Sequence, residues 1–313
     1  MDDEHGWTPL DIRPGDAGAP ADVDGLLAYL ADGDLVGDLL VKEKALVFRG
    51  FGVPRDRLEA VMDAVLPDRL AYVHGNSPRT KVGDNVYTST EYPAEMTISM
   101  HNELSYSSRW PSRLMFYCEV AADSGGATPV VDGARWLDVL DDEVRAAFAG
   151  GVRYTQNLHD GYGLGKSWQD TFETGDRDRV EAYLADMDAA WEWRPDGGLR
   201  VSQIRPATVR HPVTGEEVWF NQSDQWHPAA LGDETAAALA AVVPAEDLPQ
   251  SVAYADGRPI PADHVVQVRD RGLAEAVDVD WAPGDVLLID NVLVGHGRRP
   301  FTGSRRVLVA MTG

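Results

Sequence analysis

The sequence contains little that could cross-link the chain, anchor it in a membrane or bind it to a polyanion. One cysteine, Cys118, stands among 313 residues, so neither an intrachain disulfide nor a cysteine-based zinc site can form. Lysine and arginine total 28 against 51 aspartate and glutamate residues, and the resulting formal charge of -23 disfavours nucleic acids and anionic membranes. No apolar run reaches the roughly 18 residues that a membrane span needs, and the acidic residues 1–4 do not resemble a signal peptide. We therefore expect a cytoplasmic protein with no nucleic-acid or membrane partner.

The chain also lacks the glycine-rich nucleotide-binding loops, internal repeats and low-complexity linkers that would indicate other architectures. Hydrophobic residues make up 44% of it and charged residues 25%, as in an ordinary globular protein. Short apolar segments bounded by turn residues predict strands at 10–12, 45–51, 113–120, 205–211, 216–220, 286–289 and 306–311, and the turn within 124–132 leads into another strand. This pattern predicts a mainly β protein with inserted helices, of the β-sandwich or jelly-roll type, folded as one domain over 1–313.

Helical spacing of apolar residues predicts helices at 21–40, with breaks at Gly33 and Gly37, and at 54–65, 136–148, 178–190 and 235–243. Residues 1–20 are polar and rich in Gly and Pro, and we expect a loose N-terminal arm there. The long polar segment 71–99 is typical of a lid or substrate loop. The alternation of turns with one helix over 153–200 is interpreted as an insertion.

Two short segments carry residues of the type that bind metal ions. His101 and Glu103 are two positions apart, so on an extended strand their side chains point to the same face. His296 follows an apolar run near the C-terminus and offers a third ligand. Two histidines and one carboxylate form the facial triad of non-heme Fe(II) oxygenases, which leaves metal positions open for other ligands. The same residues could bind zinc in a hydrolase, or could be merely solvated.

Three motifs, in this order along the chain, resemble the taurine dioxygenase / clavaminate synthase-like family. They are His101-x-Glu103, the turn Gly125-Gly126-x-Thr128-Pro129, and Asn291-x-x-x-Gly295-His296-Gly297-Arg298 followed by Arg305-Arg306-Val307-Leu308. Members of this family are Fe(II)- and 2-oxoglutarate-dependent oxygenases on a jelly-roll core, the double-stranded β-helix. The resemblance implies Fe(II), 2-oxoglutarate as co-substrate, and O2.

By position in these motifs, His101, Glu103 and His296 resemble the iron ligands of the family. Thr128 resembles the residue that hydrogen-bonds a carboxylate oxygen of 2-oxoglutarate, and Arg306 resembles the partner of its distal carboxylate. A guanidinium suits a fixed, bidentate carboxylate contact. Arg305 is the rival of Arg306, because neighbouring residues of a strand point to opposite faces.

The substrate implied by the resemblance is an amino acid or related small acid, hydroxylated at an unactivated C–H in natural-product biosynthesis. The segments Trp168-Gln169-x-x-Phe172-x-Thr174 and 211–222 resemble tailoring hydroxylases, some of which act on aminoacyl groups tethered to carrier proteins. Ala310 stands where taurine-type members have a second arginine, so a sulfonate substrate is not indicated. The retained carboxylate of Glu103 also argues against halogenation. The polar residues expected near the substrate are Asn76, Arg79, Asn102, Tyr106 and Arg298.

Several alternatives stay open from the sequence. A desaturase, cyclase or epoxidase would use the same iron, because the outcome depends on how the substrate is placed. A non-catalytic jelly-roll binding protein would not need the triad, and a zinc hydrolase would not need Thr128 or Arg306. The sequence leaves open whether the substrate is a free small molecule or is bound to a carrier protein, and whether the chain forms a homo-oligomer.

Overall fold

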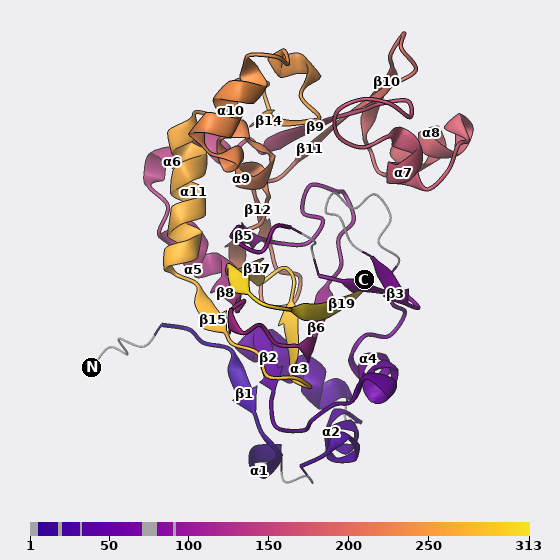
Figure 1. The fold of residues 1–313 in the computed structure, drawn as a ribbon. Helices are drawn as coiled ribbons and strands as arrows, with labels where there is room; N and C mark the ends of the chain where they lie inside the picture. Colours follow the sequence, from indigo (N-terminus) through magenta and orange to yellow (C-terminus); the bar gives the residue numbers. More distant parts are fainter. Residues whose placement is uncertain (1–5, 18–20, 32, 71–79, 90–91) are drawn as a thin grey trace.

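Two stacked β-sheets form the centre of the protein in the computed structural model, which describes residues 6–17, 21–31, 33–70, 80–89 and 92–313 (Figure 1). The larger sheet has the strand order β1-β2-β16-β6-β19-β4-β3, and the smaller one has the order β15-β8-β17-β5. The strands of the larger sheet are Leu10–Ile12, Ala45–Phe48, Val286–Asp290, Arg113–Val120, Arg306–Thr312, Val86–Thr88 and Lys81–Gly83, in that order. Those of the smaller sheet are Val277–Val279, Thr128–Asp132, Val294–Arg298 and Ile98–His101.

Side-chain alternation along β6 divides the core between the two faces of the larger sheet. Leu114 and Phe116 point into the core shared with β8 and β17 of the smaller sheet, whereas Met115 and Tyr117 point to the opposite face. That opposite face is covered by α2 (Val23–Leu30), α3 (Gly33–Glu43) and α4 (Leu58–Val65), and the 3-10 turn η1 (Arg55–Arg57) directly precedes α4. Both faces of β6 are therefore buried, which explains its nearly continuous apolar sequence.

The region 153–200 forms part of a separate antiparallel sheet, ordered β10-β11-β9-β14, at the top of Figure 1. Its strands are Ala190–Trp193, Leu199–Arg205, Val152–Leu158 and Gln250–Tyr254, and the helices α7 (Trp168–Phe172) and α8 (Arg177–Asp186) pack against it. Two short pairs complete the sheets: β12 (Thr208–Arg210) with β13 (Glu217–Trp219), and β18 (Phe301–Thr302) with β7 (Ser124–Gly125).

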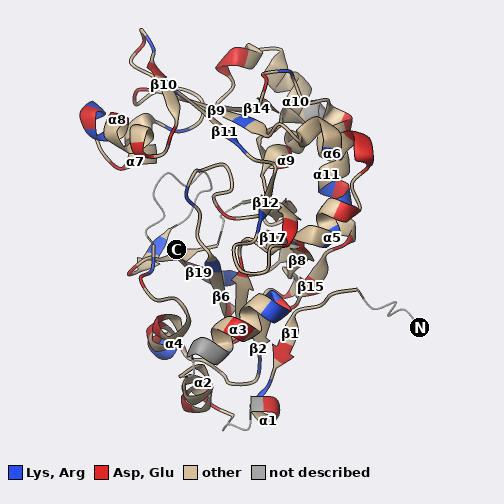
Figure 2. Cartoon of the chain, turned by 180° about the vertical axis from the view of Figure 1, so that it is seen from behind, with Lys and Arg blue, Asp and Glu red and all other residues tan. Residues whose placement is uncertain are grey.

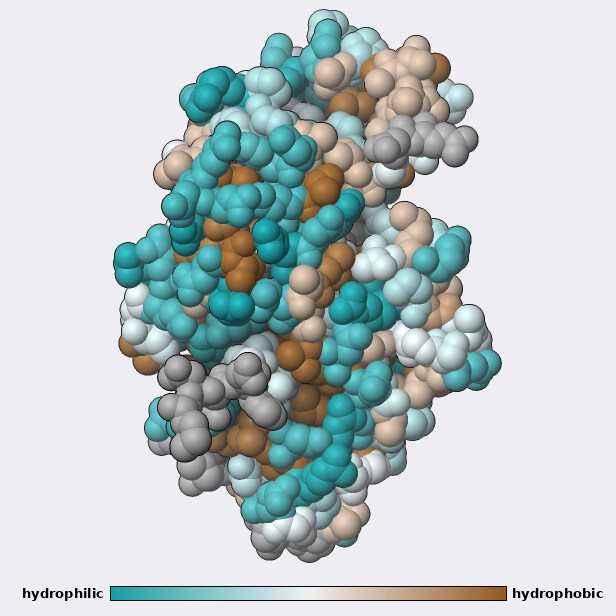
Figure 3. Space-filling model, turned by 90° about the vertical axis from the view of Figure 1, so that its left-hand side faces the viewer, coloured by the Kyte–Doolittle hydropathy of each residue, from teal (hydrophilic) through white to brown (hydrophobic). Residues whose placement is uncertain are grey.

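A second group of helices packs around Trp136 and Trp219 on the left-hand side of Figure 1. Hydrophobic residues on this face are interrupted by hydrophilic ones (Figure 3). None of the helices in the described ranges combines the length and apolarity that a membrane crossing needs. The remaining helical segments are α1 (Pro14–Ala17), α5 (Gly133–Asp138), α6 (Asp142–Phe148), α9 (Ser223–Trp226), η2 (Pro228–Leu231), α10 (Asp233–Ala240), η3 (Ala245–Asp247) and α11 (Ala262–Ala274).

The structure confirms the mainly β architecture and corrects several element boundaries. Gly37 lies inside α3 and does not break it, and the single helix expected over 136–148 is two helices, α5 and α6. Residues 1–5 and 18–20 of the expected arm, and 71–79 and 90–91 of the expected lid, lie outside the described residues. The described part of 71–99 includes the edge strand β3 and its neighbour β4. The division into arm, lid and insertion stays a prediction.

Candidate metal centre

His101 and His296 are brought together by strand pairing in the smaller sheet. They are direct partners across the antiparallel strands β5 and β17, and their ring centroids are 4.2 Å apart. The close approach of these strands requires glycine at position 297, where a Cβ atom would lie 2.5 Å from the carbonyl oxygen of Ile98. The His101 ring is oriented by the contact of its Nδ1 with the carbonyl oxygen of Ser99 at 3.0 Å.

Glu103 completes the group from the turn that follows β5. Its Oε2 lies 4.0 Å from Nε2 of His296, and one ligand atom from each of the three residues lies within 4.8 Å of the others. All three side chains are buried, with 3–6% of each residue exposed. Within the described ranges, this is the one group of three or more potential ligands found this close together.

Two buried asparagines join the loop of Glu103 to the loop before His296. The side-chain Oδ1 of Asn291 accepts a hydrogen bond from the Glu103 backbone N–H at 2.8 Å, and its Nδ2 donates to the carbonyl of Glu103 at 3.1 Å and of Pro111 at 2.8 Å. In return, Nδ2 of Asn102 donates to the carbonyl of Asn291 at 2.7 Å and of Val294 at 3.2 Å. We call this the Asn102–Asn291 clasp. It sets the spacing between two ligand-bearing loops that are far apart in sequence.

A small cavity beside His101 and His296 is closed at its other end by Arg305 and Thr128. The Arg305 guanidinium donates to the carbonyl of Gly126 at 2.8 Å and to the hydroxyls of Ser89 and Thr128 at 3.3 and 3.4 Å. No carboxylate pairs with it within the described part of the chain. Burial, together with the positive charge of Arg298 nearby, lowers the pKa of Arg305 to about 10. A partly buried cation without a carboxylate partner among the described residues fits an anionic ligand.

The hydroxyl of Thr128 is arranged to donate a hydrogen bond into the same cavity. Its oxygen already accepts from Nε1 of Trp281 at 3.0 Å and from Arg305. Because a threonine hydroxyl has one proton to donate, that proton is left for a carboxylate oxygen. The preceding Gly125 has φ of 67°, and a Cβ there would lie 2.3 Å from the Pro300 carbonyl oxygen, which accounts for glycine in this turn.

The expectation for Arg306 is corrected by its position. Its side chain is 51% exposed and its Nε lies 2.8 Å from Oε2 of Glu119, so it forms a surface ion pair instead of reaching the metal-side cavity. Arg305, the rival assignment, is the arginine that points to Thr128. The pairing register also shifts between Arg306 and Val307, so simple alternation along β19 could not decide between the two arginines.

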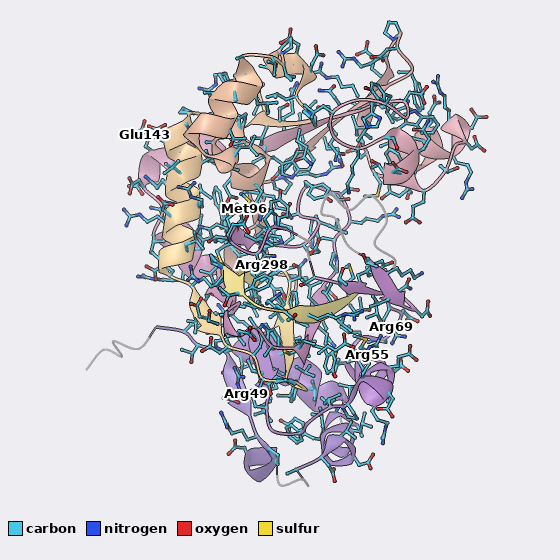
Figure 4. All side chains as sticks on the ribbon, in the orientation of Figure 1. Arg49, Arg55, Arg69, Met96, Glu143 and Arg298 are labelled. Atoms are coloured by element: carbon cyan, nitrogen blue, oxygen red, sulfur yellow. The ribbon has the colours of Figure 1, made fainter. Side chains whose placement is uncertain are left out.

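Three of the expected substrate residues have structural contacts instead. Asn102 belongs to the clasp, and Tyr106 packs in the core against Trp226, with ring centroids 5.0 Å apart. Arg298 lines the cavity, but its guanidinium donates to the carbonyls of Tyr92, Pro93 and Met96 at 2.6–3.0 Å. Figure 4 shows Arg298 close to Met96 at the centre of the molecule. Asn76 and Arg79 lie outside the described residues.

The arrangement fits a transition metal with a bound dicarboxylate. Two imidazoles and one carboxylate, all buried on one side of a common point, match the donor set of the Fe(II) facial triad. Phe116 packs on His296, with centroids 5.1 Å apart, and Val307 also lines the cavity, so the metal-side walls are apolar. Neither Arg305 nor Thr128 is needed by a zinc hydrolase.

Residues whose importance the sequence did not reveal include Asn291, Trp281 and Ser89. Asn291 stands inside a recognised motif, but its bond to Glu103 depends on two loops meeting in space. Two other histidines have structural contacts: His211 contacts Asp290 at 3.2 Å and His227 contacts the Ile260 carbonyl at 3.1 Å.

Comparison with known proteins gives a consistent assignment. The family model described as taurine catabolism dioxygenase TauD, TfdA family matches residues 11–312. The dapdiamide synthesis protein DdaC of Enterobacter agglomerans is 37% identical over 310 residues, covering 96% of this chain and 93% of DdaC. A clavaminate synthase-like protein of Arabidopsis thaliana is 35% identical over 283 residues, covering 87% of this chain and 82% of that protein.

Solved structures share the fold at low identity. The PvcB protein of Pseudomonas aeruginosa has a TM-score of 0.55 at 14% identity, covering 99% of this chain and 88% of PvcB. An asparagine oxygenase in complex with Fe(II), 2S,3S-3-hydroxyasparagine and succinate has a TM-score of 0.55 at 15% identity, covering 97% of this chain and 93% of that one.

Proposed function

Because the chain belongs to the TauD/TfdA family and is an Fe(II)/2-oxoglutarate-dependent dioxygenase, we propose that it hydroxylates an unactivated C–H bond of an amino acid or related small acid. The observation that carries this proposal is the buried His101–Glu103–His296 group beside Arg305, which has no carboxylate partner among the described residues. A role in natural-product biosynthesis is supported by the name of DdaC and by the description of PvcB as an oxygenase from an isonitrile synthetic pathway.

In this proposal His101, Glu103 and His296 hold the iron. The clasp fixes the backbone of Glu103 against the loop before His296, so the three ligands are held in position before metal arrives. The bond from His101 Nδ1 to the Ser99 carbonyl assigns the proton to Nδ1 and leaves Nε2 as the ligand atom.

Arg305 and Thr128 hold the carboxylate of 2-oxoglutarate that lies away from the metal. The guanidinium supplies charge and a planar set of donors, and the Thr128 hydroxyl supplies one more donor. Trp281 orients that hydroxyl. The sequence-based expectation assigned Thr128 to a carboxylate oxygen of 2-oxoglutarate without saying which carboxylate. We assign Thr128 to the distal carboxylate, because its hydroxyl is hydrogen-bonded to Arg305.

Iron with bound 2-oxoglutarate and O2 supplies the oxidant for the substrate C–H bond, with release of succinate and CO2. The chain's own contribution is to position both partners and to exclude water. Phe116, Val307 and Ile98 form apolar walls around the site, and the ligands are almost fully buried.

The partner of the enzyme is a small-molecule substrate, and we extend the proposal to a substrate delivered as an aminoacyl group on a carrier protein. We also retain homo-oligomerisation and a cytoplasmic location as parts of the proposal. The chain has one cysteine, the buried Cys118, so no intrachain disulfide can form, which is typical of proteins from a reducing compartment.

The test is an anaerobic titration of Fe(II) with 2-oxoglutarate, monitored by the weak visible charge-transfer band of an iron-chelated keto acid. We expect the band to appear, to vanish when O2 is admitted, and succinate to form. His296→Ala should lose both signals, whereas the control His264→Ala, on α11 away from the triad, should keep them. Iron binding by the wild type without a band or succinate would refute the function.

A further inference from the structure

His211 begins the tight turn 211–216 between β12 and β13, and its ring is buried, with only 4% of the residue exposed. The backbone N–H of His211 donates to the carbonyl of Glu216 at 2.8 Å, and the N–H of Gly215 donates to the carbonyl of His211 at 2.9 Å. These two bonds close the turn. The imidazole is therefore held at a fixed place in the protein interior.

The contacts of the two ring nitrogens assign the proton of His211 to Nε2. Nδ1 lies 3.1 Å from the backbone nitrogen of Thr214, and because this N–H can only donate, Nδ1 accepts. In the neutral ring Nε2 then carries the proton, and it donates to Oδ2 of Asp290 at 3.2 Å. The turn thus selects the tautomer that donates to a carboxylate 79 positions further along the chain.

Asp290, the last residue of β16, uses its other carboxylate oxygen to hold the turn that follows. Its Oδ1 accepts from the backbone N–H groups of Val292 at 2.9 Å and Leu293 at 3.0 Å. Its own N–H donates to the carbonyl of Lys44 at 3.0 Å, so the residue is also anchored in the larger sheet. Asp290 is 6% exposed, and a carboxylate this deeply buried needs its hydrogen-bond donors.

The turn 291–293 determines where two metal ligands lie. Asn291 stands inside it and bonds to both the N–H and the carbonyl of Glu103. The carbonyl of Val294, directly after the turn, accepts another bond of the clasp, and His296 follows two residues later on β17. A shift of this turn would therefore change the position of Glu103 relative to His296.

The donor on His211 keeps the carboxylate of Asp290 in the orientation that holds the turn. Without it, Oδ2 of Asp290 would be buried and would lose this hydrogen bond, which is unfavourable. The carboxylate would then rotate toward other donors, and its bonds to the N–H groups of residues 292 and 293 would weaken. The effect of His211 would in this way reach the metal ligands through the backbone.

We propose that His211 is a positioning residue of the metal centre, which acts through Asp290 and the turn 291–293 on the spacing between Glu103 and His296. The inference rests on the proposed function and extends its site by a residue that does not bind the metal. It also assigns a task at the metal to the turn 211–216, which belongs to a segment that resembles tailoring hydroxylases.

The experiment measures the Kd of Fe(II) by anaerobic equilibrium dialysis, and the unfolding free energy of the metal-free protein in denaturant. His211→Leu removes the donor, whereas His211→Gln keeps an N–H donor that can reach the position of Nε2. His227→Leu is the matched control. In His227, too, Nδ1 accepts from a backbone N–H, that of Ala229 at 3.1 Å, and Nε2 contacts a fixed acceptor, the Ile260 carbonyl at 3.1 Å.

We expect His211→Leu to raise the Kd of Fe(II) roughly three- to tenfold, at the low end of the effects of residues that orient metal ligands. His211→Gln should stay within about twofold of the wild type, because the bond to Asp290 is kept. His227→Leu should lower the unfolding free energy about as much as His211→Leu does, and should leave the Kd of Fe(II) unchanged.

A double variant tests whether His211 acts through Asn291. In Asn291→Ala the contact of the turn with Glu103 is already lost, so the addition of His211→Leu should raise the Kd of Fe(II) much less than it does in the wild type. If His211→Leu does not fold, Asp290→Asn takes its place in every comparison. Its amide nitrogen must face one of the N–H groups that the carboxylate accepts from.

Three results would overturn the inference. They are an unchanged Kd of Fe(II) in the folded His211 or Asp290 variant, an increase as large in His227→Leu, and full additivity with Asn291→Ala. Each of them leaves the proposed oxygenase function standing, because the wild type still binds Fe(II). If the wild type itself did not bind Fe(II), the proposed function would be refuted instead, so the two failures are distinguishable.

Discussion

Arg305 and Arg306 are adjacent in sequence but have opposite environments, which makes them a matched pair for mutagenesis. Arg305 bonds to Thr128 and has no carboxylate partner among the described residues, whereas Arg306 pairs with Glu119 at the surface. We predict that Arg305→Ala raises the Kd of 2-oxoglutarate at least tenfold, because a charged hydrogen bond contributes about 1.5–3 kcal/mol. Arg306→Ala should leave that Kd within about twofold, because exposed ion pairs contribute little. The measurement is an anaerobic titration of the charge-transfer band. If Arg306→Ala raised the Kd of 2-oxoglutarate and Arg305→Ala did not, Arg306 would be the residue that binds the distal carboxylate.

Asp224 provides a second prediction at the scale of one residue, on stability alone. Its pKa is raised from 3.8 to about 6 in the folded protein. The folded state therefore binds more protons than the unfolded state between about pH 4 and 6, and stability falls as pH rises through this window. The full cost, about 3 kcal/mol for a shift of about two pH units, is present above pH 6 and absent below pH 4.

Asp224→Asn removes this titration. We predict that the variant is more stable than the wild type at pH 8 and that its advantage shrinks as the pH falls from 6 to 4. Denaturant unfolding at these pH values is the measurement, and Asp263→Asn, whose side chain is exposed, is the control. A difference between wild type and Asp224→Asn that does not change with pH would contradict the buried, charged carboxylate.

The residue scale also shows where sequence reasoning reached its limit. His101, Glu103 and His296 could be proposed as a metal site from residue type and motif order, and the structure brings their side chains together. The choice between Arg305 and Arg306 could not be made, because it depends on a register shift in β19. Asn102 and Tyr106 were expected near the substrate only because they are polar and close in sequence to the ligands, and both side chains turn into the protein instead.

At the scale of elements, the Asn102–Asn291 clasp connects β5 and its turn to the loop before β17. Asn291→Ala would leave the buried N–H of Glu103 and the carbonyl of Pro111 without their partners. We predict a loss of about 2–4 kcal/mol in unfolding free energy and an increase of roughly tenfold or more in the Kd of Fe(II), because Glu103 is no longer held against His296.

The control for this prediction is Asn157→Ala. From strand β9, away from the metal, Nδ2 of Asn157 donates to the backbone carbonyls of Glu246 at 2.9 Å and Leu248 at 2.7 Å. Asn157→Ala should lose about as much unfolding free energy as Asn291→Ala, without a change in the Kd of Fe(II). Equal effects of the two variants on Fe(II) binding would mean that the clasp stabilises the fold without positioning the ligands.

Five strands of the larger sheet, β1, β2, β6, β16 and β19, were predicted from apolar runs bounded by turns. The sheet of β9, β10, β11 and β14 was not predicted, because 153–200 was interpreted as turns with one helix. Helix α11 was not predicted, since its apolar positions are interspersed with charged residues and its sequence has no N-terminal capping side chain. The split between α5 and α6 also escaped prediction, because the same apolar face continues across both helices. In each case packing, not local propensity, determines the structure.

At the scale of the whole molecule, a charge of -23 surrounds a site that must bind a dianion. Acidic residues are spread over helices on several sides of the chain (Figure 2). Such exposed charges are screened over about 8 Å at physiological ionic strength. We therefore expect the partly buried guanidinium of Arg305 to influence the affinity for 2-oxoglutarate more than the net charge does.

The three metal ligands also connect separate parts of the chain, 101–103 and 296, so metal binding should stabilise the fold as a whole. A ligand that binds only the folded state at 100 times its Kd adds about 2.7 kcal/mol. We predict that Mn(II), used because it resists oxidation, raises the Tm by several degrees. Subsequent addition of 2-oxoglutarate should raise it again, because the second ligand binds beside the first.

Three variants separate the Tm increase caused by Mn(II) from the further increase caused by 2-oxoglutarate. His296→Ala should lose both, because 2-oxoglutarate is bound largely through the metal. Arg305→Ala should keep the Mn(II) increment and lose most of the second one, while Arg306→Ala should keep both. If Mn(II) raised the Tm of His296→Ala as much as that of the wild type, the metal would bind elsewhere. The assignment of His101, Glu103 and His296 as metal ligands would then be wrong. The proposed 2-oxoglutarate site would lose its basis too, because it depends on metal bound at these three residues.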